Sequence, residues 1–93
     1  MTTPDAVRLN LGCGGKRVDG FVGVDRWPTP AVDVIADLAR ALPFADASAD
    51  EILLDNVIEH VADIPALMRE LHRMEHDDAR LIVRTPHFTS LSS

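Results

Sequence analysis

The feature that most limits the fold of this chain is the short spacing between two apolar runs. Residues 7–12 (VRLNLG) and 21–25 (FVGVD) are rich in Val, Leu and Phe and are bounded by Gly and Asp, which predicts two buried strands. Only eight residues, 13–20, connect them. A parallel pair usually needs a crossover of a dozen or more residues, commonly a helix. Eight residues nevertheless stretch to roughly 26 Å, against roughly 20 Å for a six-residue strand, so a nearly extended return with little or no helix is geometrically possible.

The pattern of short apolar runs continues along the chain. Residues 32–38 (VDVIADL) and 50–56 (DEILLDN) predict a third and a fourth strand, and residues 80–85 predict a fifth, ended by Pro86. Between the fourth and fifth strands the apolar period changes to three and four, which predicts a helix capped by Asp63 with Pro65 in its first turn. Its apolar positions are Ile64, Leu67, Met68, Leu71 and Met74.

Strands alternating with loops and a helix predict an α/β fold. We expect a Rossmann-like, mostly parallel sheet of about five strands with a shortened first crossover, forming a single partial domain over residues 1–93. In such sheets ligands bind outside the carboxyl ends of the strands. Polar and glycine residues collect at those predicted ends, in residues 12–15, at Asp25 and Asp37, in residues 56–60 and at His87.

Composition narrows the classes of partner. The net charge of -6 argues against a surface that neutralises phosphates, so nucleic acid is not the expected partner. The chain has one cysteine, no apolar run near the length of a membrane span and no signal-like start at Met1. We therefore expect a cytoplasmic protein with no membrane partner.

The glycine loop and the following aspartate indicate a nucleoside site. Gly12, Gly14 and Gly15 let the backbone approach a ligand closely, and Asp25, at the end of the next predicted strand, can accept both hydroxyls of a ribose. The dinucleotide fingerprint G-x-G-x-x-G is broken because Arg17 stands where its third glycine belongs. A phosphate-binding P-loop is also disfavoured, since GGKR lacks its spacing and its hydroxyl residue.

Five segments together resemble one family. LNLGCGG, FVGVD, VIADL followed by LPF, DEILLDNVIEHV, and a helix followed by RLIVRTPHF occur in the order seen in class I S-adenosylmethionine-dependent methyltransferases of the type 11 kind. The resemblance implies a Rossmann-like fold, S-adenosylmethionine as cofactor and methyl transfer to an acceptor, expected to be a small molecule. It also implies a chain that stops after the fifth strand, without the family's usual C-terminal strands.

The resemblance also implies roles for matched positions. Gly12, Cys13 and Gly14 would approach the methionine part of the cofactor, and Asp25 would bind the ribose hydroxyls. Asp37 would meet the adenine by its side chain and Leu38 by its backbone N–H. The end of the fourth strand, from Leu54 to Asn56, would lie beside the methionine amine and the sulfonium.

Few residues need to act chemically in methyl transfer, because the cofactor already carries an activated methyl group and alignment supplies most of the catalysis. Glu59, His60 and His87 are the candidate acid or base residues. Each also has a structural interpretation, as a side chain that only hydrogen-bonds the nearby backbone. Cys13 is interpreted as a small packed residue because no base is evident beside it.

One further motif has the spacing of a zinc site. HRMEH, residues 72–76, matches the H-x-x-E-H of inverted zinc peptidases, in which two histidines four apart on a helix hold the metal. Such a site needs a third protein ligand, and no glutamate follows Glu75. No metal site is predicted.

Two functions of different classes remain open. The chain is either a methyltransferase that acts as a homodimer, with a partner chain or as the N-terminal portion of a longer protein, or a non-catalytic half-domain that binds the cofactor, or only another protein, through its open edge. The fifth strand is expected to form that open sheet edge, which favours association.

Overall fold

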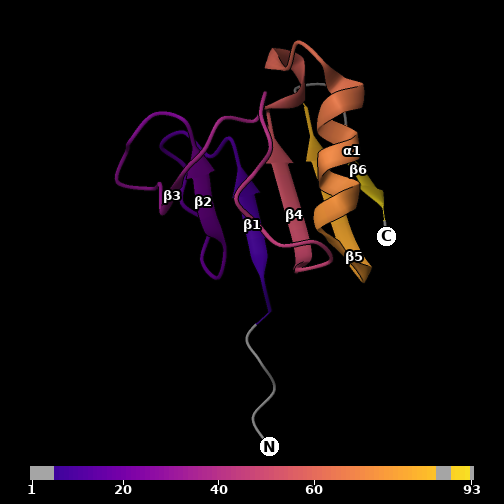
Figure 1. The fold of residues 1–93 in the computed structure, drawn as a ribbon. Helices are drawn as coiled ribbons and strands as arrows, with labels where there is room; N and C mark the ends of the chain where they lie inside the picture. Colours follow the sequence, from indigo (N-terminus) through magenta and orange to yellow (C-terminus); the bar gives the residue numbers. More distant parts are fainter. Residues whose placement is uncertain (1–5, 86–88, 93) are drawn as a thin grey trace, which may run out of the picture.

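The computed structural model describes residues 6–85 and the backbone of residues 89–92, and it arranges them around one six-stranded sheet (Figure 1). The spatial order is β3-β2-β1-β4-β5-β6. The first five strands are parallel and β6 is antiparallel to β5, which confirms the predicted Rossmann-like α/β fold. The strands are β1 (Arg8–Leu11), β2 (Val22–Asp25), β3 (Val34–Ile35), β4 (Ala49–Asp55), β5 (Glu75–Arg84) and β6 (Thr89–Ser92).

The first crossover contains no helix, as its length predicts. β1 and β2 are parallel, with Leu9 opposite Val22, and two turns carry the chain back between them. In these turns Lys16 N–H donates to the Cys13 carbonyl at 2.9 Å and Phe21 N–H donates to the Val18 carbonyl at 3.1 Å. The crossover therefore lies as a loop against the sheet where α/β proteins usually carry a helix.

Helix α1 (Ile64–Met74) covers one face of the sheet beside β4 and β5 (Figure 1). Asp63 caps it as predicted, because its carboxylate accepts the Ala66 N–H at 3.0 Å. Of the predicted apolar positions, Leu67, Leu71 and Met74 are buried, whereas Ile64 at the first turn is exposed. Each fully buried leucine of this kind contributes about 2 kcal/mol through burial. The core on this face comprises Leu9, Leu11, Val24, Leu42, Ala49, Ile52, Leu54, Val57, Leu67, Leu71 and Met74.

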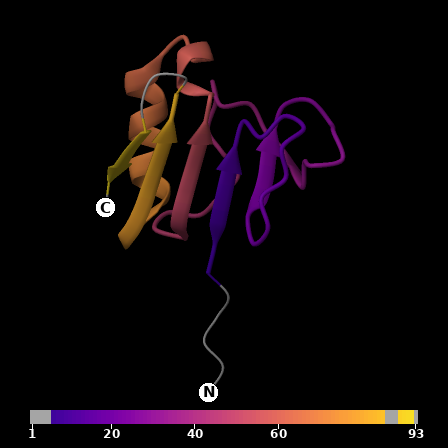
Figure 2. The same cartoon turned by 180° about the vertical axis from the view of Figure 1, so that it is seen from behind.

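The opposite face of the sheet carries no helix in the described part of the chain (Figure 2). Side chains alternate along a strand, so Asn10, between the core residues Leu9 and Leu11, points to this second face. Asn10 is nevertheless buried, and its side-chain amide donates to the Lys16 carbonyl at 3.1 Å. The first crossover thus covers the second face of β1.

β3 is shorter than predicted. Residues 32–38 were expected to form a strand, but only Val34–Ile35 pair regularly with β2. Asp33 explains the late start, since its N–H donates to the Gly23 carbonyl while its own carboxylate accepts the Gly23 N–H, both at 2.8 Å. The Asp33 carboxylate thereby takes the place of a backbone carbonyl as the partner of the Gly23 N–H. The regular pairing with β2 starts only at Val34, and β3 is a short edge strand.

The C-terminal half of the sheet also differs from expectation. β5 begins at Glu75, directly after α1, and its pairing with β4 shifts between Ala49 and Glu51 before the regular ladder starts at Arg80. The expectation that this fifth strand is an open edge is wrong, because β6 pairs with it from Arg84↔Thr89 to Leu81↔Ser92. A short antiparallel strand therefore forms this edge of the sheet.

Candidate functional site

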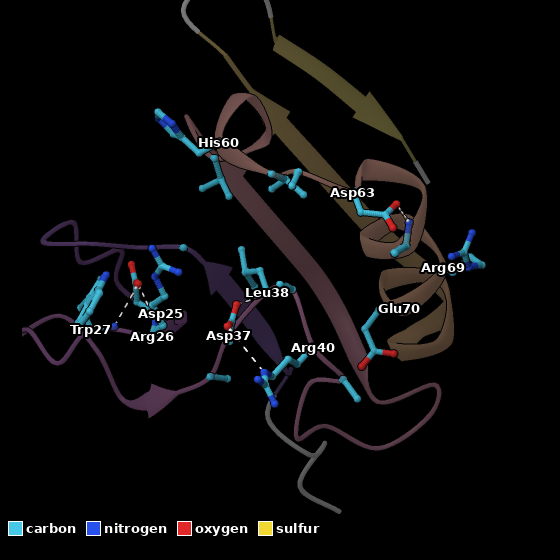
Figure 3. A pocket seen from close by; sticks show the side chains of 18 of the residues that line it. Asp25, Arg26, Trp27, Asp37, Leu38, Arg40, His60, Asp63, Arg69 and Glu70 are labelled. Atoms are coloured by element: carbon cyan, nitrogen blue, oxygen red, sulfur yellow. Dashed lines mark hydrogen bonds and ion pairs between the residues drawn. The ribbon is translucent and has the colours of Figure 1, made fainter.

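A cavity of about 800 Å³ lies at the carboxyl ends of the central strands, between the loop after β2, the loop after β3 and helix α1 (Figure 3). It lies where parallel sheets of this type bind ligands. Six of the residues singled out in the sequence line it, and they come from five separate segments. These six are Gly12, Asp25, Asp37, Leu38, Asn56 and His60.

Asp25 joins the glycine loop to the end of β2. Its Oδ2 accepts the Gly14 N–H at 2.8 Å, and its Oδ1 accepts the N–H groups of Arg26 at 2.7 Å and Trp27 at 3.4 Å. A carboxylate oxygen has two lone pairs, so Oδ2 retains one for a further donor, whereas Oδ1 can take one only in place of the long contact from Trp27. The carboxylate is thus held in a fixed orientation at the edge of the cavity and can still accept further hydrogen bonds.

The glycine loop approaches the cavity with backbone alone. Gly12 has φ +68°, and a Cβ atom on it would lie 2.7 Å from Cγ2 of Val57, a buried residue that also lines the cavity. Gly14 has φ +54°, and a Cβ atom there would meet nothing within 4 Å. The first glycine is required for close packing, whereas the second faces open space.

Asp37 and Leu38 form part of the opposite wall. Asp37 Oδ1 accepts the Ala39 N–H at 2.9 Å, and its Oδ2 lies 4.0 Å from Nε of Arg40. The backbone N–H of Leu38 makes no hydrogen bond with any described residue, while the Leu38 side chain packs against the core. A free donor thus stands next to a carboxylate on this wall.

Two side chains of α1 fasten the same wall. Arg73 donates to the carbonyls of Phe44 at 2.8 Å and Leu42 at 3.1 Å, and to the carboxylates of Asp46 and Glu70 at 2.7 Å each. Glu70 also accepts the Leu42 N–H. The hydrogen bonds from Arg73 and Leu42 lower the pKa of Glu70 to about 2, and those to Glu70 and Asp46 raise the pKa of Arg73.

The end of β4 divides between core and cavity. Leu54 is fully buried in the core and does not line the cavity. Asn56 lines it with φ +57°, a left-handed conformation that Asn tolerates better than most residues, and its N–H donates to the Arg84 carbonyl at 2.8 Å. Asn56 is therefore the polar residue that the end of β4 brings to the cavity.

The candidate acid or base residues lie near the rim. Glu59 and His60 belong to the short 3-10 helix η1 (Ile58–His60), with Glu59 Oε1 3.9 Å from His60 Nε2. The His60 side chain is 79% exposed at the edge of the cavity (Figure 3), and Glu59 is outside the lining. His87 lies outside the described residues.

Cys13 is a packed residue of the glycine loop. It is buried, and its thiol is within 3.6 Å of the Gly14 carbonyl and 3.7 Å of the Ala31 carbonyl. Burial raises the pKa of the Cys13 thiol, and the negative charge of Asp25 raises it further. The thiol is thereby kept protonated, which does not suit a nucleophile.

The histidines of HRMEH do not share a helix. α1 ends at Met74, so His72 is on the helix and His76 is on β5. In the part of the chain that the structure describes, no group of three or more His, Cys, Asp or Glu side chains is placed to hold a metal ion. The same described residues contain no helix long and apolar enough to cross a membrane.

Several lining residues were missed by the sequence analysis. Trp27 is 65% exposed at the cavity edge, with the Arg26 guanidinium 5.3 Å from its ring centre. It is the only tryptophan of the chain and stands two residues after Asp25, the predicted ribose-binding residue, which was a signal that could have found it. Glu70 and Arg73 are three residues apart on the predicted helix, a spacing typical of an ion pair on one helix face. The spacing does not predict the backbone groups of residues 42–44 that the two side chains contact. α1 supplies four lining residues, and Asp63 at its cap is a fifth; the four are Ala66, Arg69, Glu70 and Arg73.

Fold and cavity together define a Rossmann-like domain with a cavity at the carboxyl ends of its strands. A family profile described as a methyltransferase domain matches residues 9–83, which is most of the chain, and the chain belongs to that family. No curated protein sequence matches it.

One solved structure has the same fold. It is a protein from Methanococcus maripaludis provisionally described as an S-adenosyl-L-methionine-dependent methyltransferase, with a TM-score of 0.69 and 12% sequence identity. The match covers 84% of this chain and 47% of the other. This chain therefore spans about half the length of the structure it matches.

Proposed function

We propose that this methyltransferase domain binds S-adenosylmethionine in the cavity and transfers its methyl group to a small-molecule acceptor. The observation that carries the proposal is the lining of the cavity, in which Asp25, Asp37 and Leu38, whose N–H is free, come together with Gly12 of the glycine loop. A cavity of about 800 Å³ lies in the range of sites for cofactor-sized molecules.

Asp25 would bind the ribose. Its carboxylate is already oriented by three backbone N–H groups; one ribose hydroxyl would donate to the remaining lone pair of Oδ2, and the neighbouring hydroxyl would donate to Oδ1 in place of the long 3.4 Å contact from the Trp27 N–H. The prior hydrogen bonds keep the carboxylate from rotating, so less conformational freedom is lost on binding.

The opposite wall would bind the adenine. Its N1 is an acceptor that matches the Leu38 N–H, and its amino group is a donor that matches the Asp37 carboxylate. The exposed Trp27 ring offers a flat apolar surface at the same cavity, and aromatic surfaces of this kind stack on bases. Loss of any one of these contacts would weaken binding without preventing it.

The methionine part would lie along the glycine loop and the end of β4, beside Gly12, Cys13, Gly14, Leu54 and Asn56. The open space at Gly14 and the amide of Asn56 support this assignment. Cys13 and Leu54 would contribute through backbone and packing, because both side chains are buried away from the cavity.

When bound, the cofactor supplies an activated methyl group. The chain would supply alignment of the acceptor and, where the acceptor must lose a proton, a base. Glu59, His60 and His87 are the proposed residues for that proton. His60 is the one of these that lines the cavity.

The alternative is a non-catalytic domain that binds the cofactor or a protein partner. The match to the solved structure covers only 47% of that chain. A non-catalytic domain would bind the cofactor product yet transfer no methyl group to any of a panel of small acceptors, whereas the enzyme would transfer it to at least one.

The deciding experiment is calorimetric titration with S-adenosylhomocysteine, the product of the cofactor, against the wild type and Asp25→Ala. We expect micromolar binding by the wild type and a loss of about 1.5 to 3 kcal/mol in the variant, the scale of hydrogen bonds to a charged group. Asp77→Ala is the matched control, because it removes an equal charge from an exposed position outside the cavity lining. A folded wild type that does not bind, or equal binding by Asp25→Ala, would contradict the ribose assignment.

A further inference from the structure

The wall that carries Asp37 and Leu38 has little secondary structure of its own. The connection from β3 to β4, residues 36–48, contains turns but no helix. At its start it is held by the two-residue strand β3 and by the Ala36 N–H, which donates to the Asp25 carbonyl at 3.0 Å. At its far end the N–H groups of Ala47 and Ser48 donate to the carbonyls of Arg73 and Met74, at 2.9 Å each. Other contacts must hold the middle of the connection.

The middle of the connection is held by the side chains of Glu70 and Arg73 of α1. Glu70 accepts the Leu42 N–H, and Arg73 donates to the Leu42 and Phe44 carbonyls, so three backbone groups of the loop are paired with two side chains. The two side chains are also hydrogen-bonded to each other at 2.7 and 2.8 Å. Hydrogen bonds involving charged groups are stronger than neutral ones, so this arrangement, the Glu70–Arg73 clasp, is a firm anchor.

The clasp is close enough to the wall to set its place. Only residues 39–41 separate Leu38 from Leu42, and a turn in which the Arg40 N–H donates to the Asp37 carbonyl at 3.0 Å shortens the path further. The side chains of Leu38 and Leu42 both pack on the core, which leaves the intervening segment little freedom. A displacement of Leu42 would therefore move Leu38 and Asp37.

We infer that Glu70 and Arg73 are positioning residues for adenine recognition, because the clasp sets where the Leu38 N–H and the Asp37 carboxylate stand. This inference rests on the proposed function, in which those two groups bind the adenine. It adds that the selectivity of the site for adenine over other purines depends on an ion pair on a different element, α1.

The test compares two ligands. S-adenosylhomocysteine presents an acceptor at N1 and a donor at C6, whereas S-inosylhomocysteine presents a donor at N1 and an acceptor at C6. The wild type should prefer the adenosyl compound by about tenfold or more, since the inosyl compound mismatches both wall groups. The ratio of the two dissociation constants then reports the alignment of the wall.

Arg73→Lys and Glu70→Gln should each lower this ratio about threefold or more, mainly by weakening the adenosyl compound. A variant that only unfolds more easily loses affinity for both ligands equally and leaves the ratio unchanged, which separates positioning from stability. Arg80→Lys is the control, because Arg80 is exposed and alternates with Leu81 of the core face, so its side chain points to the opposite face. It should leave the ratio at the wild-type value.

Each outcome decides between the inference and the proposed function. A wild type that prefers adenine and clasp variants that keep that preference would overturn the inference alone. A wild type that binds both compounds equally would show that Asp37 and Leu38 do not recognise the adenine. That result would overturn the inference but not the proposal that the cavity binds the cofactor. A folded wild type that binds neither would overturn both proposals.

Discussion

The two walls of the cavity are held in different ways. The first wall, the glycine loop, is fastened mainly by backbone groups, since the N–H groups of Gly12 and Cys13 both donate to the Val24 carbonyl, at 2.7 and 3.2 Å, and the Asp25 carboxylate adds one side-chain contact, to the Gly14 N–H. The second wall, residues 37–42, is fastened by Glu70 and Arg73, side chains about thirty residues further along the chain. One wall depends on backbone shape and the other on charge.

This difference determines how each wall responds to change. A wall held by backbone contacts tolerates changes of charge but not added atoms, because neighbouring backbone groups cannot move aside. A wall held by an ion pair tolerates changes of shape better, but it depends on the ionisation of the pair and therefore on pH. The predictions below separate the two, beginning with the largest expected effect.

Gly23→Ala should be the most destabilising change on the backbone-held side. A Cβ atom on Gly23 would lie 2.0 Å from the Ala31 carbonyl oxygen, and a backbone atom cannot rotate away as a side chain does. We expect a loss of about 3 kcal/mol or more in the free energy of unfolding, measured by urea denaturation.

Gly15→Ala is the matched control for that measurement. A Cβ atom on Gly15 would meet nothing within 4 Å, and its backbone is outside the left-handed region. The change should stay within about 0.5 kcal/mol of the wild type. Equal losses for the two variants would show that glycine flexibility, and not close packing, explains the first wall.

Glu70→Gln should destabilise the protein in a pH-dependent way. The pKa of Glu70 is about 2 in the folded chain, against an ordinary value of 4.5, so the ionised carboxylate stabilises the fold above pH 4.5. This contribution decreases as the pH falls from 4.5 and is lost at about 2. We expect the variant to be less stable by about 1 kcal/mol at neutral pH.

The measurement is urea denaturation of both proteins from pH 7 downward. The difference in the free energy of unfolding should shrink below pH 4.5 and vanish towards 2. A difference that stays constant over this range would mean that Glu70 acts through its shape and not its charge.

Much of the fold could be predicted because its determinants are local. The apolar runs, the Asp63 cap and the short first crossover all act through neighbouring residues, and the structure confirms them. The prediction failed where a distant partner decides. The length of β3 depends on the Asp33 side chain pairing with Gly23, and the edge of β5 depends on β6.

In the candidate site, too, the locally determined residues could be predicted and the contacts between distant residues could not. The glycine positions and Asp25 were readable as a motif, since absent side chains and a strand-end carboxylate leave a sequence pattern. The clasp was not readable, because its partners are backbone carbonyl and N–H groups that every residue has. Its existence depends on how α1 packs beside residues 42–46, which a spacing of three on one helix does not specify.

The smallest expected effect is that of Lys16→Ala, and it tests whether charge matters on the first wall. Lys16 Nζ lies 3.2 Å from Asp55, but its side chain is 68% exposed, and such surface pairs contribute little. The contact that fastens this loop to β1 is the Lys16 carbonyl, which accepts the Asn10 amide and is retained in alanine. We therefore expect a loss below about 0.5 kcal/mol in urea denaturation. A loss as large as that of Glu70→Gln would mean that both walls depend on ion pairs, and the contrast between them would not hold.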